Sequence, residues 1–269
     1  MAANGCTGEV NMITNSIIDL LMNRKSIRKY TDRMPTDEEI QTLARAAQQA
    51  PFAGQMCSLL LNRGGEKIPY HAPLYFTICF DMHKLEKIME KRGWKTGSCD
   101  LSLLLFGLQD AVLMAGNLVI AAESLGMGSC FIGAAPYDAK EIIEEYDLPE
   151  RVFPIVELTV GFPAEDPSPR PRYPMEYFLF EDKYPELTDD MIERAIKVMD
   201  GGYLAQDYYR EADYMVPLED DREDKYSFNN YSWTEHMSRK WGQWTPSPDG
   251  LMEQLKACGF DLNSCTKKA

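Results

Sequence analysis

The sequence predicts a globular protein that mixes helices with strands, and three observations support this prediction. An apolar stretch at 100–126 has no proline and would measure about 40 Å as a helix, enough to cross a whole domain. Two shorter apolar runs, 74–80 and 153–162, are rich in β-forming residues. The content of 45% apolar and 26% charged residues is that of an ordinary soluble domain.

The stretch 100–126 is apolar nearly all round, so we expect a helix that is buried on most sides. The alternative is a membrane span, because 101–122 reaches the necessary length. Asp110 and its polar neighbours Gln109 and Asn117 would be costly in lipid, and neither flank carries a cluster of Lys and Arg. We therefore favour the buried helix. Glycines at 126 and 128 predict its end, and 129–133 predicts a short strand.

The remaining elements follow from hydrophobic periodicity and capping signals. Thr36 and Glu39 form a capping box that predicts the start of a helix. From residue 203 the chain is rich in acidic and aromatic residues, and helical periodicity is weak there except near 251–257. Further helices are predicted at 9–22, 36–50, 82–93, 138–146 and 188–199, and further strands at 57–61 and 177–180.

Composition excludes several classes of function. A net charge of −14 with a pI near 4.7 argues against nucleic-acid and anionic-membrane partners. The first ten residues lack a secretory signal, which predicts a cytoplasmic protein. The 7 cysteines without a CxxC pair predict reduced thiols, and the 3 histidines have no metal-ligand spacing. Motifs for a nucleophilic serine, a P-loop, a zinc protease and a Rossmann site are also missing, and we predict no metal site.

Basic residues gather around Ser26 in this otherwise acidic chain. If the segment is extended, Arg24, Ser26 and Arg28 share one face, and two guanidinium groups with a hydroxyl suit a phosphate. The alternative is a solvated basic loop. A proline-rich stretch at 163–174 presents Arg170 and Arg172 on one side of an extended loop.

Six segments in order resemble signatures of the FMN-dependent nitroreductase superfamily. They are RKSIRKYTD from residue 24, APFAGQ from 50, DAVLMAGNLVIAAESLGMGSCFIGA from 110, LPERVFPIVELTVGFPAEDPSPRPRYP from 148, YLAQDYY from 203 and SWTEH from 232. The resemblance is strongest to the branch of the oxygen-insensitive NADPH nitroreductase and flavin reductase P, over residues 10–260.

The resemblance implies an α+β fold with a central mixed β-sheet flanked by helices. It implies an intertwined homodimer whose long central helix lies at the interface, with one FMN in each of two pockets. Residues 1–202 would form the FMN-binding core. Residues 203–269 would form a C-terminal extension that wraps the dimer close to the substrate and the nicotinamide.

The resemblance also implies the site residues. Relatives have serines where this chain has Pro51, Phe52 and Ala53, and a glutamine where it has Glu66. The acidic tail leaves the preference between NADH and NADPH open. Residues implied to contact FMN are Arg24, Lys25, Ser26, Arg28, Arg170 and Arg172 at the phosphate and ribityl chain, Phe52 and Gln55 from the second loop, Glu66, and Phe131, Ile132, Gly133 and Ala134 at the flavin edge. Candidates for the nicotinamide co-substrate are Arg210, Arg222 and Lys225.

The activity implied is transfer of hydride from NAD(P)H to FMN and then of two electrons to nitroaromatic, quinone or flavin acceptors, by a ping-pong cycle. Because the chemistry belongs to FMN, no catalytic side chain is needed. Two alternatives remain. One is a flavin reductase or a reductive dehalogenase on the same scaffold, and the other is a non-catalytic FMN-binding sensor or partner module.

Overall fold

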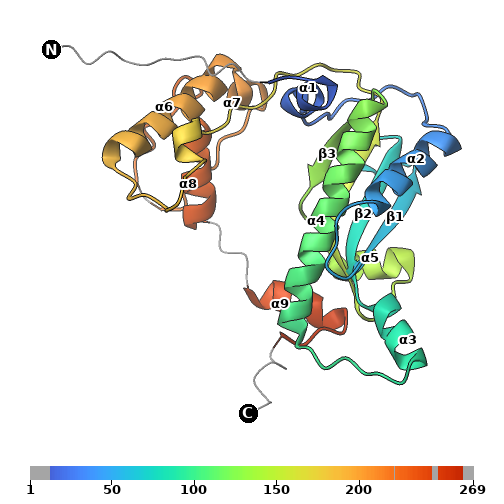
Figure 1. The fold of residues 1–269 in the computed structure, drawn as a ribbon. Helices are drawn as coiled ribbons and strands as arrows, with labels where there is room; N and C mark the ends of the chain where they lie inside the picture. Colours follow the sequence, from blue (N-terminus) through green and yellow to red (C-terminus); the bar gives the residue numbers. More distant parts are fainter. Residues whose placement is uncertain (1–12, 221, 244–247, 263–269) are drawn as a thin grey trace. The chain divides into compact units, whose positions relative to one another are not determined.

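The computed structural model describes residues 13–220, 222–243 and 248–262 (Figure 1). Contacts divide the chain into two compact units. The first contains Met1–Asp166 and Cys258–Ala269, and the second contains Pro167–Ala257. The functional boundary expected after residue 202 falls inside a helix of the second unit, α6 (Asp189–Ala205), and stays a prediction.

A sheet of four strands forms the centre of the first unit. The strands are β1 (Cys57–Arg63), β2 (Leu74–Asp81), β3 (Gly128–Ile132) and β4 (Val152–Gly161), in the order β1-β2-β4-β3. Each was predicted within a few residues, and together with the helices they confirm the α+β class. The sheet was expected to be mixed, but these strands all pair antiparallel. A parallel pairing occurs only as the isolated bridge between Ser26 and Ser129, among the bridges that the structure describes.

The two faces of the sheet differ in chemistry because side chains alternate along each strand. On one face Phe76 and Phe80 of β2 are fully buried, as is Leu158 of β4, which pairs with Phe76. On the other face Thr77 donates a hydrogen bond to the buried carboxylate of Glu157 at 3.3 Å. The first face is thus the apolar core against which a helix can pack.

Helix α4 (Asp100–Ser124) packs against β2 on this face and against α2. Gly107 lets it come close, because a Cβ at this position would overlap the ring of Phe80. Although α4 is long and apolar enough to cross a membrane, this packing confirms the core helix. The expectation of burial on most sides was wrong for the single chain, because the sheet and α2 cover part of the helix and leave another side open. Leu105 and Val112, each 54% exposed, lie on the open side.

Four shorter helices complete the first unit. Helix α2 (Asp37–Gln48) starts at the predicted capping box, in which Thr36 and Glu39 exchange side-chain to backbone hydrogen bonds. Helix α1 begins later than predicted, after the N-cap Asn15, and residues 9–12 of the prediction lie outside the described residues. The bounds of the other helices are α1 (Ser16–Asn23), α3 (His83–Lys91) and α5 (Ala139–Tyr146), with a short 3-10 turn η1 (Pro69–His71).

The second unit is helical in the part that the structure describes. Beside α6 it contains α7 (Tyr208–Glu211), α8 (Trp233–Gln243), α9 (Pro248–Ala257) and the 3-10 turn η2 (Met175–Tyr177). The strand predicted at 177–180 was wrong: Phe178 and Leu179 follow η2 and are exposed. Helices α7 and α8 were missed. Helix α8 is anchored partly by polar contacts, such as Thr234 with Asp200, and its buried residue is Arg239, which is why apolar periodicity alone did not reveal it.

After α9 the chain returns to the first unit. The backbone N–H of Arg151 donates to the Cys258 carbonyl at 2.7 Å, and the ring of Phe260 stacks on Phe80 with centroids 4.9 Å apart. Arg151 also pairs with Asp100 at the start of α4. Cysteines 57, 79, 130 and 258 are free thiols, as predicted. Cys99 is disulfide-bonded, which corrects the expectation of reduced thiols throughout.

Candidate functional site

The basic segment at 24–28 is fixed along the edge of the sheet beside β3. Ile27 is 2% exposed, and its N–H donates to the Ser129 carbonyl at 2.9 Å. Since Ile27 turns into the core, alternation along the extended chain places Ser26 and Arg28 on the opposite side. Arg24 follows the end of α1 with an extended backbone. The predicted extended conformation is therefore confirmed, and the segment is held by the fold, unlike a solvated loop.

Acidic side chains already engage part of this segment. The Glu165 carboxylate accepts from the backbone N–H groups of Arg28 at 2.5 Å and of Lys29 at 3.1 Å. Lys25 forms an ion pair with the exposed Asp166. The side chains of Arg24 and Ser26 form no hydrogen bond or ion pair with any residue that the structure describes. These two groups are thus available to an anion, whereas Lys25 would have to exchange the Asp166 carboxylate for that anion.

The turn from α4 into β3 lies next to this segment. Gly128 has no Cβ, and one built there would overlap the side chain of Ile27. Ser129 is 1% exposed, and its hydroxyl has no hydrogen-bond partner among the described residues. Burial raises the pKa of the Glu123 carboxyl at the end of α4, and the nearby cations Arg24 and Lys25 oppose the rise. Because of the overlap with Ile27, a glycine is required at position 128, where the basic segment crosses β3.

Strand β3 ends in an exposed turn. Phe131 is 43% exposed, Ile132 is half-buried, and Gly133 and Ala134 are exposed at the start of the turn. A Cβ at Gly133 would meet no atom within 4 Å. The backbone that was predicted to meet the flavin edge is accordingly open to approach by a planar ligand.

The loop at 50–56 is organised by a single buried carboxylate. Asp110 of α4 is 1% exposed and accepts from the N–H groups of Ala53 at 2.5 Å, Gly54 at 3.1 Å and Met56 at 2.9 Å. Within this loop Gln55 adopts a left-handed backbone with φ of 50°. Such strain persists only where the surroundings impose it, and it occurs often at ligand sites. Asp110 supplies that constraint.

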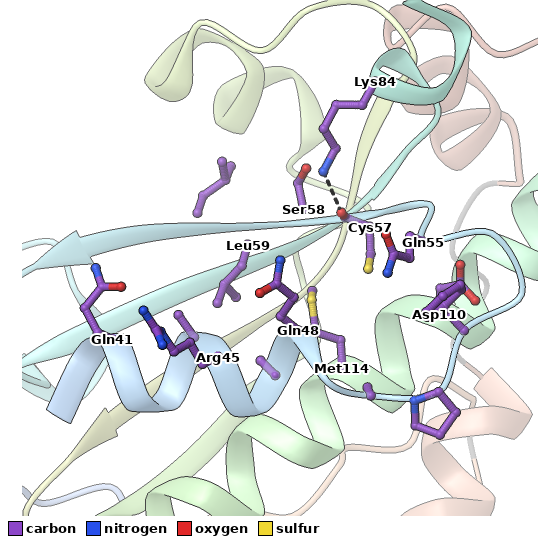
Figure 2. Close-up of a pocket in the computed structure, with 16 residues that line it drawn as sticks. Gln41, Arg45, Gln48, Gln55, Cys57, Ser58, Leu59, Lys84, Asp110 and Met114 are labelled. Carbon is purple, nitrogen blue, oxygen red and sulfur yellow. Dashed lines mark hydrogen bonds between the residues drawn. The ribbon is translucent and has the colours of Figure 1, made fainter. Parts of the chain in front are cut away.

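A cavity of about 530 Å³ opens between this loop, α2 and β1 (Figure 2). Its volume is in the range of small-molecule sites. Phe52 and Gln55, both predicted to contact the flavin, line it. The other lining residues are Gln41, Ala44, Arg45, Ala47, Gln48, Ala50, Pro51, Cys57, Ser58, Leu59, Leu60, Lys84, Asp110 and Met114.

Sequence reasoning missed Asp110 and the polar residues of α2 that line this cavity. Asp110 had been noted only as a polar interruption of the long helix, although a carboxylate within an apolar stretch was the signal. Gln41, Arg45 and Gln48 recur at helical spacing and project from α2 toward β1 (Figure 2). This polar stripe can be recognised in the sequence once the buried apolar stripe of α2 has been assigned.

Glu66 lies apart from the groups described so far. It is exposed in the turn after β1, where Gly64 and Gly65 have positive φ angles of 60° and 146°. The structure places no flavin-site residue in hydrogen-bond contact with it among those described. Its predicted position opposite the flavin ring stays a prediction.

The second unit contains the later pair of arginines. Arg170 donates to the Gln206 side chain at 2.7 Å, and its guanidinium lies over the ring of Tyr208 at 4.1 Å. Arg172 donates to the backbone carbonyls of residues 170 and 171. That these arginines share an anion with the basic segment of the first unit stays a prediction.

The tail arginines proposed for the nicotinamide are engaged locally. Arg210 pairs with Asp207 at 2.6 Å and donates to Asn229, and Arg222 pairs with Asp220. Lys225 is exposed. Any phosphate bound by these two arginines would have to displace a carboxylate, and their role toward the nicotinamide stays a prediction.

The nitroreductase family model matches residues 21–61 and 61–162, which include the basic segment, the loop with its cavity and β3. A curated relative, the "FMN reductase (NADPH)" of Bacillus subtilis, is 31% identical over 213 residues, covering 73% of this chain and 84% of the relative. The chain belongs to the nitroreductase family.

Two further comparisons agree with this membership. The "oxygen-insensitive NADPH nitroreductase" of Salmonella typhimurium is 28% identical over 203 residues, covering 70% of this chain and 83% of that family member. The solved structure of NfrA2 from B. megaterium superposes with a TM-score of 0.77 and 27% identity, covering 92% of this chain and 99% of that one. The nitroreductase fold therefore extends over both units of the chain.

Proposed function

We propose that the protein is an FMN-dependent oxidoreductase that takes hydride from NAD(P)H and passes two electrons to flat acceptors such as nitroaromatics, quinones or flavins. The basic segment carries the proposal. In a chain of net charge −14 it presents two uncommitted donor side chains, Arg24 and Ser26, on a backbone that is fixed to the sheet. The names of the relatives, an FMN reductase and a nitroreductase, support the same assignment.

The donor set fits a phosphate monoester, because guanidinium, ammonium and hydroxyl groups all donate to phosphate oxygens. In this proposal Arg24, Ser26 and Arg28 bind the phosphate, and Lys25 adds charge. The loop that Asp110 holds orients Phe52 and Gln55 against the ring system. FMN, when bound, supplies the hydride and electron chemistry. The residues of the chain would bind FMN, orient its ring and exclude water. The hydride donor and the electron acceptor would enter the site in turn.

FMN affinity tests the phosphate assignment. Arg24→Ala and Arg28→Ala are each expected to weaken binding by about 1.5–3 kcal/mol, which is the contribution of a charged hydrogen bond. Lys29→Ala is the matched control, since Lys29 is an exposed cation of the same segment whose hydrogen bonds use its backbone. Quenching of FMN fluorescence on titration with protein gives the dissociation constants. Equal affinity in all four proteins would contradict the assignment.

Steady-state rates separate the enzymes that could use this scaffold. We expect the purified protein to bind FMN, to be reduced by NADH or NADPH, and to give parallel lines in double-reciprocal plots. Comparing a nitrofuran, a quinone, free FMN and a halotyrosine as acceptors distinguishes a nitroreductase from a flavin reductase and a dehalogenase. Bound FMN without turnover of any acceptor would instead indicate a flavin-binding sensor.

We further propose that the protein is a cytoplasmic homodimer. The open side of α4 exposes Leu105 and Val112, and α1 exposes Ile17. Apolar surface of this extent on a single chain is typical of a protein interface. Light scattering is expected to give twice the chain mass of 30.7 kDa. A double change, Leu105→Glu with Val112→Glu, should give monomers, whereas Ile88→Glu at an exposed apolar position of α3 should not. A monomeric wild type would refute the dimer.

A further inference from the structure

The face of α2 that borders the cavity is polar. The capping box at Thr36 sets the start of the helix, and Ile40, Leu43 and Ala47 form its buried stripe. Beside that stripe, residues 41, 45 and 48 repeat at the spacing of one helix face and line the cavity (Figure 2). A helix needs only its buried stripe to pack. The polar stripe is therefore free to bind a ligand.

Arg45 is an uncompensated cation at this cavity. It forms no hydrogen bond or ion pair with any residue in the described part of the chain. Arg33 and Arg63 of the same unit pair with Glu39 and Asp37, whereas Arg45, like Arg24, has no partner among the described residues. Its exposed guanidinium is therefore available to an anion that enters the cavity.

The other charges that line the cavity do not neutralise Arg45. Asp110 is the carboxylate among the lining residues, and it is occupied by three backbone N–H groups of the loop. Lys84 donates to the Cys57 carbonyl at 2.9 Å and lies 3.5 Å from Asp81. The cavity is consequently a local positive site. A guanidinium binds carboxylate oxygens in a bidentate geometry.

The remaining walls suit a flat apolar body. Phe52, Leu59 and Met114 line the cavity, and the side chain of Gln55 offers an amide for hydrogen bonding. A ligand that fits both the guanidinium of Arg45 and these apolar walls is an aromatic ring carrying a carboxylate. Phe52 and Gln55 belong to the loop that the proposed function places against the flavin ring, which connects the cavity to the acceptor.

We propose that this cavity admits the electron acceptor and that Arg45 selects aromatic acceptors bearing a carboxylate. The inference rests on the proposed oxidoreductase function and adds a substrate class to it. Arg45 acts in binding, so its effect is expected on KM for charged acceptors, with kcat and neutral acceptors little changed.

The test compares two acceptors of the same shape, 4-nitrobenzoate and 4-nitrobenzamide, in the FMN-loaded enzyme. In wild type, kcat/KM is expected to favour the carboxylate. Arg45→Gln should lower the ratio of the two kcat/KM values by about 10-fold or more, as loss of a charged hydrogen bond does. Arg45→Lys should retain part of the preference, because the charge remains and the planar fork is lost. Arg92→Gln removes a charge from an exposed position after α3, outside the cavity, and should leave the ratio unchanged.

A binding measurement separates this inference from the proposed function. Equilibrium dialysis of 4-nitrobenzoate against the FMN-loaded protein without NAD(P)H should give weaker binding to Arg45→Gln than to wild type. If no acceptor is turned over, the proposed function fails and dialysis still decides the role of Arg45. An unchanged acceptor ratio, an equal loss for both acceptors, or equal binding of 4-nitrobenzoate by both proteins overturns the inference.

Discussion

Replacing Asp110 with asparagine should destabilise the loop at 50–56 and, through it, the first unit. The carboxylate accepts three backbone N–H groups. An amide of the same shape has one oxygen. At the Oδ2 position it keeps the hydrogen bonds from Gly54 and Met56 but makes them neutral, and its NH₂ group turns toward the N–H of Ala53. Ala53 is exposed, so water can satisfy its N–H, whereas Met56 is 5% exposed and its N–H keeps only the weaker neutral bond. Exchanging charged for neutral hydrogen bonds predicts about 1–2 kcal/mol of destabilisation.

Urea unfolding measures the loss of stability, and amide hydrogen exchange locates it. Asp110→Asn should lower the free energy of unfolding by the stated amount and speed exchange at Met56. FMN affinity should fall as well, because Gln55 would no longer be held in its left-handed conformation. Asp190→Asn, at an exposed position of α6, is the control for the change in charge. A stability within about 0.5 kcal/mol of wild type, with exchange at Met56 unchanged, would refute the role given to Asp110.

Two further predictions concern a close contact and a histidine. Gly128→Ala should destabilise the protein by about 1–3 kcal/mol and weaken FMN binding, since the new methyl group overlaps Ile27; Gly97→Ala, in an exposed loop with open space, should do neither in the same urea and FMN titrations. Burial first, and Lys240 second, lower the pKa of His236. The folded state therefore binds fewer protons, so stability should fall as pH drops through about 6.5. Urea midpoints followed by tryptophan fluorescence should show this dependence in wild type and less of it in His236→Gln.

Much of the first unit could be predicted because its elements pack through apolar periodicity. The strands at 74–81 and 152–161 are apolar on consecutive positions, and the capping box at Thr36 is a local signal that needs no tertiary context. Helix α8 has a weaker local signal. Its Arg239 is 4% exposed and pairs with Glu235 one helical turn earlier, but also with Asp224, which lies outside the helix and could not be assigned as a partner from the sequence.

The candidate site also has a part that could be predicted from the sequence and a part that could not. The basic segment was predictable because charge clustering and strand alternation are both visible in the sequence around Ser26. Its attachment to Ser129 and the overlap avoided at Gly128 depend on pairing between distant segments. Asp110 and the polar stripe of α2 are each visible in the sequence, but their meeting in one cavity could not be predicted, since its walls come from α2, β1 and α4 and Asp110 holds a loop 54–57 residues away.

The return of the chain to the first unit after Ala257 makes the second unit an insertion between Asp166 and Cys258. A protease that cuts once between these positions would produce two fragments, and neither should be released. The downstream fragment still contains Phe260, which stacks on Phe80, and Cys258, whose carbonyl accepts from Arg151. A nicked molecule should thus elute from a sizing column with the intact protein and separate only in denaturant.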